Sequence, residues 1–141
     1  MSVRVTLGKW DEQSRDAKPI RYDVFVTEQK VPLDMEWDEM DVHCVHAVAY
    51  DAEGQAVGTG RLLPDGHIGR MAVRQAVRGQ GVGACMLEAL VEAARARGDR
   101  EVMLNAQEQA EPFYERYGFR REGEMFMEAG IPHIHMRRAL T

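Results

Sequence analysis

The run Arg78-Gly79-Gln80-Gly81-Val82-Gly83-Ala84 constrains this chain more than any other feature of its sequence. It lies between a segment that alternates like a strand, residues 67–73, and a segment with helical periodicity, residues 81–97. Glycines let a backbone approach a ligand closely, and the first turn of a helix presents unpaired N–H groups and the positive end of the helix dipole. Residues 67–87 also hold three arginines and no acidic residue. The run therefore predicts a turn that binds an anion, most naturally a phosphate group.

Two familiar phosphate motifs fit this turn poorly. A P-loop requires Gly-Lys-Ser/Thr, whereas the chain has Gly83-Ala84-Cys85, so the lysine and the magnesium-binding hydroxyl are missing. Gly79, Gly81 and Ala84 do satisfy the looser dinucleotide fingerprint G-x-G-x-x-G/A. The next expected strand, however, ends at Asn105 with no acidic residue for a ribose hydroxyl, and too little chain follows for a doubly wound sheet.

Hydrophobic periodicity and turn residues predict the elements around the turn. The expected strands cover residues 3–7, 45–51, 55–63, 67–73, 101–105, 119–127 and 132–139, and the expected helical segments cover 11–29, 81–97 and 109–117. Asp11 is the expected N-cap of the first segment, which Pro19 divides into two short helices. Residues 102–104 form an apolar run typical of a buried parallel strand. The fold class is therefore α/β, a single domain over 1–141 with a mixed, mostly antiparallel central sheet of six to seven strands flanked by about four helices.

Composition excludes several classes of function. The chain holds 18 Lys and Arg against 23 Asp and Glu, a net charge of −5, which disfavours a general nucleic-acid binder. No apolar stretch approaches the ~18 residues of a membrane span, and residues 1–10 do not resemble a signal peptide, so we expect a cytoplasmic protein with no membrane partner. Two cysteines are too few for a disulfide framework. The run His43-Cys44-Val45-His46 lacks a second ligand cluster, so we expect no metal.

Three motifs resemble those of the GNAT superfamily, the GCN5-related N-acetyltransferases. Arg78-x-x-Gly81-x-Gly83 is similar to the acetyl-CoA-binding motif Q/R-x-x-G-x-G/A, and residues 110–119 resemble the C-terminal helix motif A-x-x-F-Y-x-x-x-G-F. Residues 68–73 look like the strand that precedes the turn in that superfamily. Further segments resemble a small bacterial single-domain subgroup, namely 21–29, 105–107 and 128–133. The resemblance implies the acyl-CoA N-acyltransferase fold and an enzyme that transfers the acetyl group of acetyl-CoA directly to an amine.

The resemblance also implies how acetyl-CoA, the expected co-substrate, is held. The backbone N–H groups of the turn bind the pyrophosphate with an arginine beside them, which assigns donor binding to Arg78, Gly79, Gln80, Gly81, Val82, Gly83 and Ala84. The backbone of Met71, Ala72 and Val73 polarises the thioester carbonyl where neighbouring strands diverge, so that pantetheine pairs like an extra strand. Asn105, a poor strand former at the expected end of a buried strand, is the candidate partner of the pantetheine amides.

Two side chains are the candidate catalytic groups. Tyr114 is the candidate general acid, because a phenol can return a proton to a thiolate of similar basicity, although an aromatic core role is the alternative. His133 is the first choice of general base, because histidine titrates near neutrality. Glu28, Glu36 and His135 are also chemically able, a hydrogen-bonded structural histidine is the alternative for His133, and deprotonation through water needs no dedicated base.

The acceptor side is predicted from charge. Acidic residues concentrate in residues 34–41, away from the basic turn, and could attract a cationic amine; a solvated loop is the alternative. We expect Glu28 and Glu36 to bind the acceptor, a small molecule that carries a primary amine. A non-catalytic acyl-CoA-binding sensor is the alternative function, and residues 24–29 are also loosely similar to acyl-homoserine-lactone synthases. The sequence leaves open the acceptor's identity and whether the protein is a monomer or a homodimer.

Overall fold

The strands are divided between two sheets in the computed structural model, which describes residues 2–33 and 38–141. The first sheet consists of β1 (Arg4–Gly8), β2 (Val45–Tyr50), β3 (Ala56–Leu62) and β4 (Ile68–Val73), antiparallel neighbours in that order. In the second sheet, β8 (Ile131–Ala139) pairs antiparallel with β5 (Glu101–Gln107), β6 (Arg120–Arg121) and β7 (Phe126–Glu128). The helical elements include α1 (Trp10–Arg21), α3 (Val82–Ala96) and α4 (Glu111–Arg116), the π-helical η1 (Tyr22–Glu28) and the 3₁₀ segments η2 (Glu39–His43), η3 (Gln75–Val77) and η4 (Glu108–Ala110).

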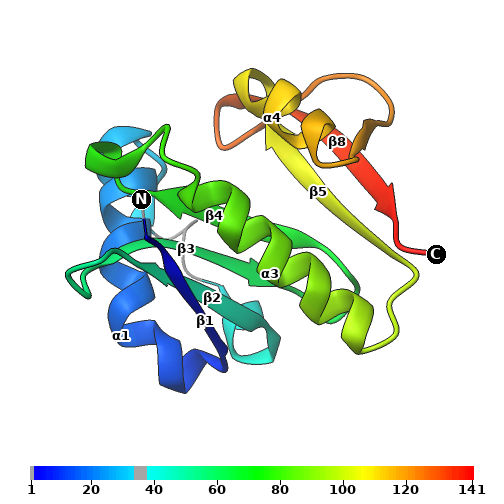
Figure 1. The fold of residues 1–141 in the computed structure, drawn as a ribbon. Coiled ribbons are helices and arrows are strands. Elements are labelled where there is room, and N and C mark those ends of the chain that lie inside the picture. The colour runs from blue at the N-terminus through cyan, green and yellow to red at the C-terminus, as the bar shows by residue number, and fades with distance from the viewer. Residues whose placement is uncertain (1, 34–37) are drawn as a thin grey trace.

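This architecture confirms the α/β fold class and its mostly antiparallel strands. The described residues hold eight strands and three α-helices, against the six to seven strands and about four helices expected. Within them, β4 and β5 are linked by a single parallel bridge between His67 and Met103, and Figure 1 shows the two strands diverging from each other. The expectation of a parallel strand at 102–104 is met only at Met103, because β5 otherwise pairs antiparallel with β8. A continuous apolar run reports burial of both faces, not strand direction.

The first helix differs from the prediction at its N-cap and at Pro19. It begins at Trp10, with Lys9 and not Asp11 at the N-cap, and the Lys9 N–H donates to the Glu12 carboxylate at 2.8 Å. Pro19 lies inside α1 and does not divide it. A proline removes one N–H from the helical ladder. Three residues later the chain passes directly into the wider π-helical turns of η1.

Three further boundaries were misplaced. Strand β5 continues two residues past Asn105, and the helix expected at 109–117 begins as the 3₁₀ turn η4 before α4. The strand expected at 119–127 is two short strands, β6 and β7. Gly123 lies between them with φ of 81°, a left-handed conformation that interrupts an extended strand.

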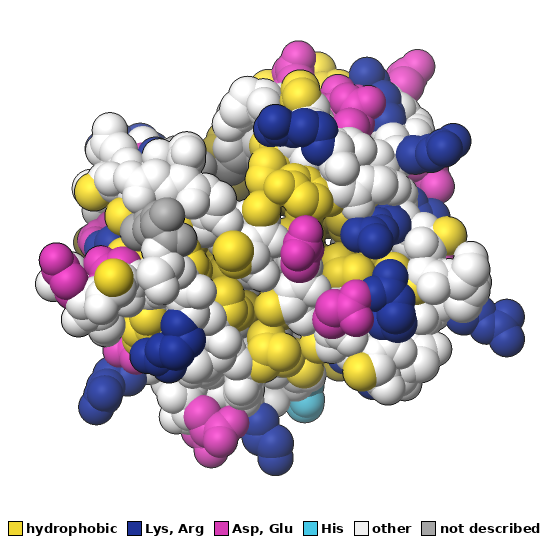
Figure 2. All heavy atoms as spheres, viewed as in Figure 1, with side chains coloured by type: hydrophobic (Ala, Val, Ile, Leu, Met, Phe, Trp, Pro, Cys, Tyr) yellow, Lys and Arg dark blue, Asp and Glu magenta, His cyan; other side chains and the backbone are white. Residues whose placement is uncertain are grey.

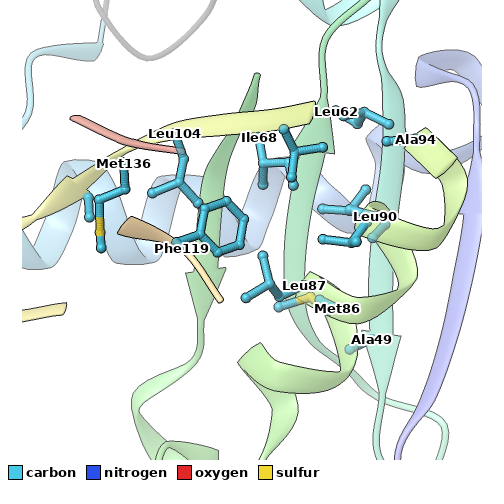
Figure 3. Close-up of a cluster of buried hydrophobic side chains, with 14 of the residues drawn as sticks. Ala49, Leu62, Ile68, Met86, Leu87, Leu90, Ala94, Leu104, Phe119 and Met136 are labelled. Carbon is cyan, nitrogen blue, oxygen red and sulfur yellow. The ribbon is translucent and has the colours of Figure 1, made fainter. Parts of the chain in front are cut away.

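One continuous core joins the two sheets through α3. Helix α3 packs on the face of the first sheet that carries Gly58 and Gly60, while α1 contacts β3 and β2 beside a separate small apolar cluster. The absence of a side chain at Gly58 is what lets the helix approach, since a Cβ there would lie 2.8 Å from Met86 Cε. Figure 3 shows Phe119 close to Leu87 of α3, Leu104 of β5 and Met136 of β8. Both sheets therefore contribute to the same core.

Candidate functional site

A β-bulge in β4 shapes the strand at the point where the sheets separate. Thr59 pairs with Ala72 and Arg61 with Gly69, so Arg70 and Met71 together oppose the single residue Gly60. Arg70 has φ of 49°, a left-handed conformation that is costly for a residue with a Cβ. Bulges bend a strand and re-aim its groups, and they are frequent next to active sites. The bulge therefore turns the β4 backbone at Met71 out of the regular ladder.

A cavity of about 510 Å³ opens where β4 and β5 diverge. One wall comes from β3, β4 and the end of η1, and the other from β5, α4 and the β7–β8 hairpin. The lining includes several predicted site residues, namely Met71, Asn105, Tyr114 and His133. It also includes Arg61, Arg70 and Glu128, which the sequence analysis did not assign to the site.

The described residues of the glycine turn do not line this cavity; the turn follows the end of β4, and its Gly83 lies beside Phe113, the neighbour of the cavity-lining Tyr114. Gly79 and Gly81 have φ of 81° and 86°, and a Cβ at either position would meet no other group within 4 Å. Gly81 is the N-cap of the 15-residue α3, and no side chain caps the helix. The first N–H groups of α3 therefore remain available to an anion.

The turn lies close to α4 on one side and to the end of β4 on the other. A Cβ at Gly83 would lie 3.6 Å from the Phe113 ring of α4 and 3.8 Å from the Val73 side chain of β4. Figure 2 shows hydrophobic side chains gathered near the middle of the viewed face. The contacts of Gly83 place the start of α3 between α4 and the end of β4.

Arg78 is already engaged beside the turn. Its Nε donates to the Val73 carbonyl at 2.9 Å, and its guanidinium pairs with the Glu28 carboxylate, also at 2.9 Å. Both side chains of the ion pair are partly exposed. The neighbouring Arg74 pairs in the same way with Asp23 of η1. Two arginines of the basic segment are thus held by acids of one π-helical segment.

Tyr114 lies on the cavity wall within an aromatic cluster. Its ring contacts Phe113 edge-on, with centroids 5.0 Å apart, and Phe119 at 5.9 Å. Burial raises the pKa of Tyr114 to about 12, so the phenol is protonated at neutral pH. Its hydroxyl forms no hydrogen bond with any residue that the structure describes. The side chain contributes both to the core, which was the alternative expectation, and to the cavity.

The two histidines of β8 have different partners. His133 is buried, and its Nδ1 is 2.7 Å from the Ile131 carbonyl oxygen. His135 is bound through Nδ1 to the Asn105 side-chain oxygen at 2.9 Å, and only His133 of the two lines the cavity. The contact to His135 leaves the Asn105 amide nitrogen as the group of that side chain able to donate elsewhere.

Comparison with known proteins decides the family. The family model described as Acetyltransferase (GNAT) domain matches residues 13–140. The chain belongs to the GNAT acetyltransferase family. Over 138 residues it is 41% identical to a Bacillus subtilis protein named Uncharacterized N-acetyltransferase YjcF, covering 95% of this chain and 98% of that one.

Solved GNAT structures agree with this assignment. An acyl-CoA N-acyltransferase from Pseudomonas aeruginosa has a TM-score of 0.86 and 35% identity, covering 98% of this chain and 100% of that one. The Escherichia coli protein ElaA has a TM-score of 0.85 and 28% identity, over 97% and 99% of the two chains. The expected superfamily is confirmed, and so is the expectation of an acetyl-CoA-dependent acyltransferase.

The acidic loop of this GNAT chain differs from what its composition suggested. Asp38 accepts two hydrogen bonds from Arg61, at 2.7 and 2.9 Å, and one from Arg70 at 3.2 Å. Asp41 is buried between Arg21 and Arg61, both at 2.9 Å. These two acids are committed to arginines and are not free for a cationic acceptor. The predicted acceptor residue Glu36 lies outside the described residues.

Sequence reasoning missed this buried ion network. It joins α1, η2, β3 and β4 through Arg21, Asp41, Arg61, Asp38 and Arg70. The hydrogen bond to Arg61 is the main cause that lowers the pKa of Asp38 to about 2. The available signal was Arg61 itself, a charged residue in the otherwise apolar and small strand 56–62. A charge in a buried strand requires a buried partner.

Two further searches bear on the expected partners. Within residues 2–33 and 38–141, no His, Cys, Asp and Glu side chains gather in a group of three that could hold a metal ion. No helix in those ranges is long and apolar enough to cross a bilayer. Near the run 43–46, the Cys44 thiol instead contacts the Met40 carbonyl at 3.1 Å, and the His46 ring contacts the Asp41 carbonyl at 2.8 Å.

Proposed function

We propose that this protein transfers the acetyl group of acetyl-CoA directly to a primary amine of a small acceptor. The observation that carries the proposal is the bulged, divergent end of β4, which opens onto a cavity holding Tyr114 and His133 beside the uncapped N-terminus of α3. One end of this arrangement suits a phosphate, and the other offers a proton donor and a proton acceptor. The same arrangement supports direct transfer, in which acetyl-CoA and the acceptor amine would meet at the Met71 backbone.

The donor would be held mainly by backbone. The N–H groups of residues 79–84 would bind the pyrophosphate, with Arg78 exchanging its contact with Glu28 for a phosphate oxygen. The Met71–Val73 backbone, turned by the bulge, would donate to the thioester carbonyl and to pantetheine, and the Asn105 amide would donate to a pantetheine carbonyl. Preorganised donors at a developing oxyanion are worth about 100- to 1000-fold in rate.

Two side chains of this chain would manage the protons. His133 Nε2 accepts one proton from the acceptor ammonium, and the neutral nitrogen then forms the C–N bond as the thioester C–S bond breaks. Tyr114 gives its hydroxyl proton to the departing sulfur and regains one from the acylated nitrogen. The products are an amide and free CoA thiol, with one proton left on His133 and then lost to water. Burial keeps the Tyr114 phenol protonated at neutral pH, so its proton is present when the thiolate forms, although the raised pKa makes it a weaker acid than a phenol in water.

The acceptor amine is cationic when it arrives, since a primary amine is protonated at neutral pH. We propose Glu28 and Glu36 as its further contacts, and in that role Glu28 becomes available only when Arg78 leaves it. A cytoplasmic location and a monomer or homodimer remain expectations of the same proposal.

The first test is the thermal unfolding midpoint with acetyl-CoA, CoA, NAD and ATP. A ligand at ~100 times its Kd stabilises the fold by ~2.7 kcal/mol, which for a chain of this size raises the midpoint by about 8 °C. Acetyl-CoA and CoA should produce this shift and NAD should not. A shift with NAD alone, or with none of the four, would overturn the donor site.

Tyr114→Phe tests the chemistry separately from binding. It should lower kcat for thiol release by about 100-fold, the usual loss for a general acid, while the acetyl-CoA shift persists. An unchanged kcat would remove Tyr114 from the mechanism and leave the donor site standing.

A further inference from the structure

The β7–β8 hairpin carries a carboxylate to the cavity wall. Ala129 and Gly130 form its two-residue loop, with φ of 52° and 77°. Positive φ at both loop residues matches a type I′ turn, whose twist fits the flanking strands. Ala129 tolerates a conformation that usually requires glycine. The turn fixes the register, so Glu128 pairs with Ile131 and Phe126 with His133.

That register places Glu128 and His133 on the same face. Directly opposed residues of an antiparallel pair share a face, and so do residues two apart along a strand. Glu128 Oε2 is 3.5 Å from His133 Nε2, and both side chains line the cavity. The Phe126 ring stacks on the imidazole, with centroids 6.0 Å apart and 28° between the planes. The imidazole thus has a ring stacked on one side and a carboxylate near one of its nitrogens.

The other ring nitrogen settles which tautomer is present. The Ile131 carbonyl oxygen can only accept a hydrogen bond, so His133 Nδ1 carries the hydrogen at 2.7 Å. In the neutral ring, Nε2 is then the nitrogen with a lone pair. It is also the nitrogen that faces Glu128.

We propose that Glu128 is a positioning residue that acts through His133: its charge stabilises the imidazolium that forms when Nε2 takes the amine proton, while the Ile131 carbonyl holds the ring at Nδ1. This role rests on the proposed function, because it requires His133 to be the base. The proton stays on Nε2, and Glu128 supplies the neighbouring negative charge without itself becoming protonated. In hydrolase triads the carboxylate stabilises the imidazolium from the opposite nitrogen, Nδ1; here the Ile131 carbonyl contacts Nδ1, and Glu128 acts by its charge near Nε2.

No other acid competes for this role among the residues described. Gln107, opposite His133 on β5, is uncharged, and the Tyr114 phenol is neutral at physiological pH. His135, two residues along β8, is bound to Asn105. Glu122, whose N–H donates to the His135 carbonyl, directs its carboxylate to Arg137. Glu128 is therefore the carboxylate to test, and Glu122 is a matched control outside the cavity lining.

The acceptor-free test is NMR of the His133 ring, assigned with His133→Gln. In Glu128→Gln the pH profile of the ring signals should differ from that of wild type, with less imidazolium at a given pH, because the negative charge beside Nε2 is lost. Glu128→Asp should restore part of the difference, and Glu122→Gln should leave the wild-type profile. Identical profiles in wild type and Glu128→Gln would overturn the proposal without bearing on acetyl-CoA binding.

The kinetic test uses thiol release with 1,4-diaminobutane, glucosamine and glycylglycine as probe amines. Glu128→Gln should lower kcat about 10-fold with an unchanged KM for acetyl-CoA, and adding it to His133→Ala should cause no further loss. Multiplicative losses would contradict coupling between the two residues. If His133→Ala keeps full kcat, the base assignment of the proposed function fails and the role of Glu128 falls with it.

Discussion

The two walls of the cavity are held by different kinds of interaction. On the β3–β4 wall, Asp41 and Arg61 are 3% and 6% exposed and bind each other directly. On the β5–β8 wall, the closest ion pair, between Arg137 and Glu101, has side chains 36% and 42% exposed. Exposed pairs contribute little because water competes with them, whereas a buried charge without its partner is very costly. The first wall should therefore be rigid and intolerant of change, and the second adjustable.

This division suits the chemistry of the site. The bulge at Arg70, which sets the backbone that would polarise the thioester, lies at one end of the buried ion network through Asp38. The groups proposed to move protons, Tyr114 and His133, come from the other wall. The proposed oxyanion contacts are thus linked, through the partly exposed Asp38, to the buried Arg61–Asp41 pair, whereas the proposed acid and base lie on the opposite wall.

Among the proposed variants, Asp41→Asn should have the largest effect on stability. It removes the carboxylate shared by two buried arginines, and we expect it to destabilise the protein by about 3 to 5 kcal/mol. Glu101→Gln on the second wall removes a carboxylate from an exposed pair and should cost about 1 kcal/mol or less. Urea unfolding of both variants measures the difference. Similar losses would show that the two walls are not held differently.

Acid should weaken the first wall more than the second. The Asp38 pKa is about 2 in the fold against an ordinary value of 3.8, mainly because Arg61 donates to its carboxylate. A depressed pKa means that Asp38 stabilises the fold above pH 4, and that this contribution, about 1 to 2 kcal/mol, is lost as the pH falls from about 4 to 2.

The matched variants are Asp38→Asn and Glu122→Gln, compared by urea midpoints between pH 2 and pH 5. Asp38→Asn should flatten the pH dependence over this window. Glu122 also has a lowered pKa, because Arg137 donates to it, but the pair is exposed and its removal should leave the profile nearly parallel to wild type. A parallel profile for Asp38→Asn would locate the acid sensitivity elsewhere.

The sequence predicted the strands of the first wall and the glycine turn better than it predicted the element boundaries of the second wall and the contacts that hold the first. The glycine turn and α3 follow from local rules, since positive φ and helix termini depend on residues next to each other. The Arg21–Asp41 and Arg61–Asp41 pairs each join residues 20 apart, and no local pattern specifies them. The bulge was equally hidden, because nothing in the strand alternation marks Arg70 as left-handed. Local sequence thus predicted the glycine turn and the start of α3, and tertiary contacts decided the shape of the cavity.

The smallest expected effect concerns the ion pair between Arg78 and Glu28, which joins the turn to η1. Both side chains are partly exposed, so Glu28→Gln should change stability by less than about 1 kcal/mol. Unlike a substitution that damages the site, Glu28→Gln should strengthen acetyl-CoA binding, because Arg78 no longer has to leave a carboxylate to contact a phosphate. We expect Glu28→Gln to tighten acetyl-CoA binding about 2- to 5-fold, and Arg78→Gln to weaken it about 10-fold. Calorimetric titration of both variants with CoA distinguishes the two signs. Weaker binding in both would mean that the pair acts as a unit that shapes the turn, and that Glu28 does not compete with phosphate.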